Sequence, residues 1–210
     1  MTVYKLTNEQ METRNGTKWE IGKEKSIEKN KQSSELCSDG VLHAYNSVEL
    51  ALLLNPIHAN ILNVRLFEAD AHIVVSEWDK CGAHKMILTK ELDVPGWYKN
   101  KKVSLLFAIK CAKEVLHIFE QQWPDDNRPR LATEAAERYI KNPTQENRMA
   151  ASAAADAAYA AAASTAAAYA AIPAYAAAAA AYADHAAAAA IKICFLKLAK
   201  ESIKEAQDDD

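Results

Sequence analysis

A long alanine tract in the C-terminal half constrains this chain more than any other feature of its sequence. Between Ala151 and Ala190, 28 of the 40 residues are alanine, and four of the others are tyrosine. Alanine is the strongest helix former, and its methyl group supplies no nucleophile, base or metal ligand. The tract therefore predicts closely packed helices and disfavours an active site in this part of the chain.

Composition changes near residue 100, and the 210-residue chain exceeds a typical single domain. The turn-forming run Val94-Pro95-Gly96-Trp97 interrupts the chain close to this change. We therefore expect a first domain over residues 1–98 and a second domain over residues 99–210.

The first domain is expected to combine strands with one helix. Runs rich in apolar residues predict short strands near residues 3–6, 41–45, 63–75 and 85–92. A helix should begin at a cap, Asn46 or Ser47, and end at Asn55-Pro56, because proline disfavours helical backbone before it. The polar run 24–34 predicts an exposed loop, and the run 79–82 predicts a turn.

The second domain has helical periodicity from Val103 onward, with apolar residues at three- and four-residue spacing. Pro124 ends the first helix, and Pro173 either kinks one long rod or begins a new antiparallel helix. A compact domain favours the new helix, so we predict helices over about 103–122, 129–141, 145–172 and 173–206. The fold class is therefore α+β, with a small mixed α/β N-terminal domain followed by an alanine-rich antiparallel α-helical bundle.

Charge and composition predict a cytoplasmic protein. The formal net charge of −3 gives no electrostatic footprint for nucleic acid, whose binding needs clustered cations. The N-terminus lacks the basic and apolar regions of an export signal, and four scattered cysteines fit reduced thiols in a cytosol. The alanine tract contains Asp156 and Asp184, so we expect no membrane span.

Cys37 with His43 and Cys81 with His84 could be written as a zinc site. Their spacings, Cys-x5-His and Cys-x2-His, match no strong ligand pattern. Small buried thiols with surface imidazoles are the favoured interpretation, so neither a metal site nor a cofactor is predicted.

His43 is the candidate catalytic residue. The segment from Gly40 to Ser47, followed by an apolar helix, loosely resembles the strand-to-helix segment of ADP-ribosyltransferase folds. This resemblance implies that His43 would orient a nicotinamide dinucleotide, with Glu77 or Glu91 as the late glutamate. A structural role for His43 is favoured, because no motif selects either glutamate.

Three residues of the second domain are candidate contacts for a partner: Arg128, Arg130 and Tyr139. The two arginines flank Pro129 at a helix start, where exposed backbone donors favour anions. The favoured alternative is that their guanidiniums pair with nearby carboxylates and fix the turn. The available carboxylates belong to Asp125, Asp126 and Glu134.

Several segments of the second domain form a recognisable pattern. They are Cys111–Glu120, Trp123–Ala136 with its Asp-Asn-Arg-Pro-Arg core, and Asn142-Pro143-Thr144 followed by the alanine-tyrosine tract. Over about residues 103–200 this pattern resembles the bacterial and phage "putative immunity protein" family. The resemblance implies a protein that neutralises a toxin.

The first domain resembles an uncharacterised phage-associated domain, through segments that include Val3-Tyr4-Lys5 and Trp19–Lys23. Together these features predict a non-enzymatic immunity or anti-defence protein that binds and neutralises a protein partner, either a toxin or a component of bacterial antiviral defence. Two alternatives stay open: modification of a defence protein by an ADP-ribosyltransferase-like first domain, and sequestration of a nucleotide signal between the helices. Formation of a homo-oligomer also stays open.

Overall fold

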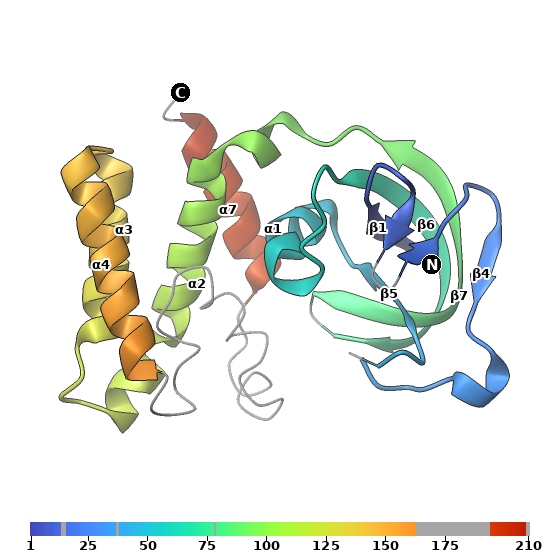
Figure 1. The fold of residues 1–210 in the computed structure, drawn as a ribbon, viewed down its shortest axis with the longest axis horizontal. Coiled ribbons are helices and arrows are strands. Elements are labelled where there is room, and N and C mark those ends of the chain that lie inside the picture. The colour runs from blue at the N-terminus through green and yellow to red at the C-terminus, as the bar shows by residue number, and fades with distance from the viewer. Residues whose placement is uncertain (14–15, 37, 78, 163–193, 209–210) are drawn as a thin grey trace. The chain divides into compact units, whose positions relative to one another are not determined.

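The computed structural model describes residues 1–13, 16–36, 38–77, 79–162 and 194–208. The chain separates into two compact units, Met1–Tyr98 and Lys99–Asp210. Figure 1 shows an antiparallel sheet with one helix in the first unit and helices in the second, so the fold class is α+β. The predicted helix start at Pro173 falls outside the described residues. Among the described helices, none is both long and apolar enough to cross a bilayer.

The first unit is built around a sheet that closes on itself. Its main strands are β1 (Thr2–Thr7), β4 (Glu24–Ser26), β5 (Leu42–Tyr45), β6 (Arg65–Ser76) and β7 (Lys80–Leu92). The strand order is β4-β7-β5-β1-β6, and β6 also pairs with β7. This second pairing joins β7, β5, β1 and β6 into a ring of antiparallel strands. Two short strands, β2 (Glu12–Thr13) and β3 (Thr17–Lys18), form a separate hairpin.

Inward-facing side chains of the strands form the core of the first unit. Val3, Phe67 and Leu88 are fully buried in one cluster, and the buried Trp19 belongs to the same cluster. Alternation of side chains along a strand places every second residue on this face. Lys5 occupies one of these inward positions and is only 8% exposed. Its Nζ donates a hydrogen bond to the carbonyl oxygen of His43.

Helix α1 (Val48–His58) follows β5 directly. The hydroxyl of Ser47 accepts a hydrogen bond from the Leu50 N–H at 3.2 Å, so the predicted cap is present. The predicted end at Asn55-Pro56 is wrong, because the helix continues through Pro56 to His58. Proline removes one N–H donor without ending the helix, and the Asn55 carbonyl accepts the N–H of Ala59 at 3.1 Å.

Two predictions about the sheet are also wrong. The segment 79–82 is not a turn, because β7 begins at Lys80. Next to the start of β7, the Glu77 N–H donates to the Lys80 carbonyl at 2.9 Å. The polar run 24–34 is not entirely loop, because residues 24–26 form the edge strand β4. Charged side chains are common on edge strands, and Glu24 forms an ion pair with Lys85 of β7 at 3.0 Å.

Short 3-10 turns complete the connections of the first unit. One covers Lys29–Lys31, within the predicted loop, and another covers Gly96–Lys99 at the junction with the second unit. The second turn begins within the run Val94-Pro95-Gly96-Trp97, which predicted the domain boundary.

The second unit contains the helices α2 (Lys101–Gln122), α3 (Arg128–Lys141), α4 (Gln145–Ala162) and α7 (Phe195–Asp208). Helix α2 packs against both α3 and α7, and α3 packs against α4. In Figure 1 the short connections make α2, α3 and α4 successively antiparallel. The last helix is described from Phe195, where the carbonyl of the preceding Cys194 accepts the Leu198 N–H at 3.1 Å.

Small side chains line the contacts between these helices. Ala132, Ala135 and Ala136 are the buried alanines of α3. On α7, Ala199 and Ala206 are fully buried. Small residues allow helix axes to approach at the short end of the usual range, about 8 Å. Buried alanines therefore lie on packed faces of α3 and α7, whereas most of the alanine tract lies outside the described residues.

Candidate functional site

Arg128 and Arg130 lie at the corner between α2 and α3, and both are paired within the unit. Arg128 donates from Nε and Nη2 to the two carboxylate oxygens of Asp126, at 2.7 and 2.6 Å. Arg130 donates in the same way to Glu120, at 2.7 Å for both bonds. The structure therefore has internal pairing at this helix start, with Glu120 as a partner that the sequence did not single out.

The local sequence explains why this corner forms. Asp126 accepts the backbone N–H of Arg128 at 3.1 Å as well as its guanidinium, so one carboxylate fixes both the first turn and the side chain. Pro129 lies at the start of α3, where its missing N–H removes no helical hydrogen bond. Hydrogen bonds from Arg128 lower the pKa of Asp126, so the carboxylate stays charged at neutral pH.

Tyr139 does not share this corner. It lies 11 residues after Arg128 on α3, which is about 16 Å along a helix axis. Its side chain is partly buried, whereas Arg128 and Arg130 are about half exposed. The three predicted contact residues therefore belong to one helix and do not form one compact patch.

His43 lies on β5, where its register partner on β7 is Gly82. Glu91 lies nine residues further along β7, about 30 Å along an extended strand, and both of its carboxylate oxygens bind Arg65 at 2.8 and 2.6 Å. Glu77 lies before β7 at the same end as Gly82, and its carbonyl accepts the side-chain amide of Asn46 at 2.8 Å. Of the two proposed glutamates, only Glu77 shares the end of the sheet that contains His43.

A buried polar pair lies close to this end of the sheet, and sequence reasoning missed it. The His58 Nε2 and the Asp79 Oδ2 are 3.6 Å apart, and the two side chains are 9% and 1% exposed. The His58 ring stacks on Tyr45, with centroids 5.8 Å apart and planes 11° apart. This arrangement places an acid and a base together, away from solvent.

Burial governs the electrostatics of this pair. It raises the pKa of Asp79 to about 6, opposed by the nearby charge of Lys80. It lowers the pKa of His58 to about 4, and the positive charges of Lys80 and His43 act in the same direction. Burial also raises the pKa of Tyr45, and the charge of Asp79 adds to this rise. At neutral pH the pair therefore consists of a neutral imidazole and an ionised carboxylate.

The cysteine and histidine residues considered for zinc do not form a described metal site. Cys37 lies outside the described residues. Cys81 is buried, and burial raises the pKa of its thiol to about 11. The Nε2 of His84 lies 2.9 Å from the carbonyl oxygen of Ser33 and is engaged there. Within the part of the chain that the structure describes, no group of three or more histidine, cysteine or acidic residues is arranged to hold a metal ion.

One comparison with known proteins gives a match. The model of the family described as "Imm-5 like putative immunity protein" matches residues 97–208. These residues nearly coincide with the second unit, Lys99–Asp210. No curated protein and no solved structure matches the chain.

Proposed function

Because the chain belongs to the Imm-5 like putative immunity protein family, we propose that it binds another protein, a toxin or a component of antiviral defence, and neutralises it. The match over residues 97–208 is the observation that carries this proposal. Since these residues are the helical unit, we assign the immunity role to that unit. The first unit would then modify which partner is bound or when.

The corner between α2 and α3 is the proposed contact surface. The side chains of Arg128 and Arg130 are 46% and 52% exposed, and the neighbouring Leu131 is 45% exposed. Their carboxylate partners already hold the guanidiniums in place, so little side-chain entropy is lost when a partner binds. Arg128 uses Nε and Nη2 internally, which leaves Nη1 available to a partner.

An interface of ordinary size would also reach further along α3. Such interfaces bury about 800 Å² on each partner. Tyr139, about 13 Å from Arg130 along the helix, would lie within that area. Arginine and tyrosine are common anchors of interfaces, so these residues are the first to substitute.

The experiment combines capture with protection. The full-length chain would be used as bait in a lysate of its native host, and a captured protein would be purified and expressed with and without the chain. We expect co-expression to restore growth or to block the activity of the captured protein. Arg130→Ala combined with Leu131→Asp should weaken binding, whereas Lys200→Ala on the exposed side of α7 should not.

His43→Ala serves as the control for an enzymatic alternative. A neutralising protein that acts by binding through its helices should protect equally well with this substitution. Loss of protection in His43→Ala with binding unchanged would refute the binding mechanism.

A further inference from the structure

One end of the helical unit gathers basic residues from three helix termini. Helices α2 and α4 begin there, and α3 and α7 end there, so the acidic Asp208 at the end of α7 lies at the same end (Figure 1). Five basic residues at this end are exposed. They are Lys99, Lys101, Arg138, Lys141 and Arg148.

These five residues differ in their pairing from several other cations of the unit. Among the residues that the structure describes, none of the five forms an ion pair. Cations elsewhere in the unit do, namely Lys110, Lys113, Arg128, Arg130 and Lys197. Glu137, one helical turn from Lys141, contacts Lys113 on α2 instead. The described contacts therefore pair most cations elsewhere in the unit, with Lys200 and Lys204 of α7 as exceptions, and leave all five at this end without an ion pair.

Two of these residues are also unfavourable for the helices that bear them. Lys101 is the first residue of α2, whose first turn contains no acidic residue, and Arg148 lies in the first turn of α4, together with Glu146. The helix dipole is positive at both positions, so a cation there lowers helix stability. Such a departure from local rules is expected at functional surfaces.

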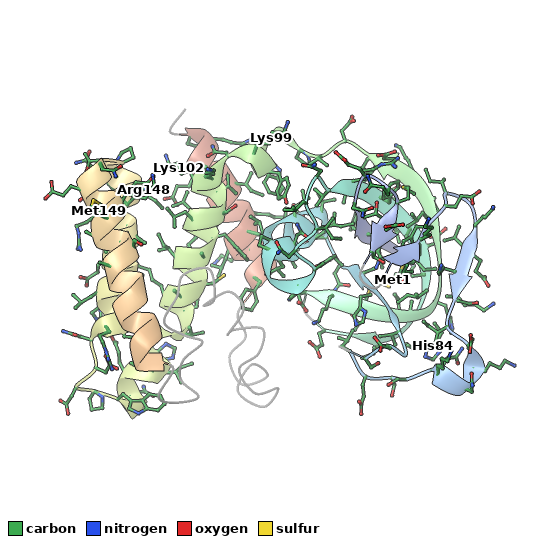
Figure 2. All side chains as sticks on the ribbon, in the orientation of Figure 1. Met1, His84, Lys99, Lys102, Arg148 and Met149 are labelled. Carbon is green, nitrogen blue, oxygen red and sulfur yellow. The ribbon has the colours of Figure 1, made fainter. Side chains whose placement is uncertain are left out.

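An exposed apolar side chain accompanies the charges. Met149 is 64% exposed and follows Arg148 on α4, and Figure 2 shows both near the start of that helix. Methionine and arginine are enriched at protein interfaces relative to the rest of the surface. A cationic surface with an apolar contact favours a protein over a purely electrostatic partner.

We propose that this basic end, as a second contact besides the corner between α2 and α3, docks on an acidic surface of the protein that the chain neutralises, an inference that rests on the proposed function. Residues 99–210 contain 14 basic and 14 acidic residues, so the unit as a whole has no net positive charge. Nucleic-acid binding proteins show a broad positive surface instead. Carboxylates at the centre of a partner surface would match this end in charge.

Poly-L-glutamate is the probe for the charge complementarity. The full chain would be titrated with it at low salt, next to a mixed-sequence DNA duplex at equal charge concentration. Binding of poly-L-glutamate should weaken at least about tenfold in the triple variant Arg138→Glu, Lys141→Glu, Arg148→Glu. A matched triple reversal of exposed lysines in the first unit should weaken it less than about threefold. The control substitutions are Lys18→Glu, Lys23→Glu and Lys31→Glu.

Zero-length carbodiimide cross-linking locates the contact. This reagent joins an amine directly to a carboxylate, so poly-L-glutamate should become attached at Lys101 and Lys141. Lys141→Arg keeps the charge and the binding but should abolish the cross-link at that position. Cross-links spread evenly over the lysines of both units, or tighter binding to DNA than to poly-L-glutamate, would overturn the proposal.

The captured partner separates this inference from the proposed function. Failure of the wild-type chain to protect against any captured protein defeats the proposed function. Full protection by the triple variant, with unchanged affinity, defeats only the acidic docking surface. A circular dichroism spectrum of the triple variant that matches the wild-type spectrum would show that loss of binding does not come from unfolding.

Discussion

The imidazole of His58 and the carboxylate of Asp79 face each other at 3.6 Å without forming a hydrogen bond. His58 comes from the end of α1 and Asp79 from the connection between β6 and β7, so the pair links the helix to the hairpin. Among the described residues, every buried side-chain polar atom without a hydrogen-bond partner belongs to this pair or to Asn46. The pair is therefore the least satisfied polar site in the described core.

The two residues shift the pH dependence of stability in opposite directions. The pKa of His58 falls from 6.5 to about 4 on folding, so its neutral form is favoured and stability is lost as the pH falls through this range. The pKa of Asp79 rises from 3.8 to about 6, so its protonated form is favoured and stability is lost as the pH rises through that range. Between about pH 4 and pH 6 the two effects oppose each other.

Single substitutions should expose each effect alone. In Asp79→Asn the free energy of unfolding should fall by about 2 kcal/mol between pH 6.5 and pH 4. In His58→Gln it should fall by a similar amount, about 2 kcal/mol, as the pH rises from 4 to 6. Urea unfolding at several pH values measures both, with the wild-type chain showing the flatter profile. Slopes of the same sign in the two variants would contradict this account.

Lys5 should destabilise the protein at neutral pH. Its Nζ lies 5.0 Å from the centre of the Trp19 ring, and burial lowers its pKa from 10.5 to about 8. Folding therefore disfavours the charged amine, and the cost is fully present below about pH 8 and is relieved as the pH rises to 10.5. Lys5→Met removes the cost of burying the charge but also removes the hydrogen bond to His43. The net result should be a free energy of unfolding that is higher by about 1 kcal/mol at pH 7.

The pH dependence of this gain provides the test. The difference between Lys5→Met and the wild-type chain, measured by urea unfolding, should shrink above pH 8 and change sign before pH 10.5, where the lost hydrogen bond outweighs the relieved cost of the charge. Lys18→Met serves as the control, because the Lys18 side chain is 79% exposed. A gain that does not change between pH 7 and pH 10 would show that the desolvated charge is not its cause.

Local sequence patterns predicted most elements but not how distant segments meet. Runs of apolar residues identified β1, β5 and β6, because most of their side chains are at least partly buried. The closed ring depends on the pairing of β6 with both β1 and β7, which no local pattern encodes. Helix α1 continued through Pro56 because its apolar side is buried, and such tertiary contacts override the effect of one missing donor.

The candidate site was predicted in part for the same reason. Arg128 pairs with Asp126, two residues away, and this spacing was visible in the sequence. Glu120 lies ten residues from Arg130 and meets it only because α2 and α3 are antiparallel. His58 and Asp79 are further apart still, and a lone histidine at a helix end carries no signal of its partner. Short-range pairs are readable from spacing, whereas long-range pairs need the fold.

Gly40 should not tolerate a side chain. A Cβ at this position would lie 2.5 Å from the Cβ of Ser33 and 2.6 Å from the carbonyl oxygen of Lys31. Backbone atoms at these distances must move, so Gly40→Ala should destabilise the first unit by about 1 to 3 kcal/mol in thermal or urea unfolding. Gly96→Ala is the matched control, since nothing lies within 4 Å of its Cβ position. Equal effects of the two substitutions would show that crowding at Gly40 is not limiting.

Close packing through small residues is testable on α7. Ala199 is fully buried on the side of α7 that packs against α2, whereas the next residue, Lys200, is exposed. Ala199→Leu adds three carbon atoms where the helices already touch, so it should lower the free energy of unfolding by about 1 to 3 kcal/mol. Lys200→Leu places the same leucine side chain on the exposed side of α7, and it should change the free energy of unfolding by less than about 0.5 kcal/mol. The larger side chain at position 199 can be accommodated only if α7 moves away from α2. Amide hydrogen exchange should therefore become faster along α7. An unchanged exchange rate there would show that the two helices are not held by contact between small side chains.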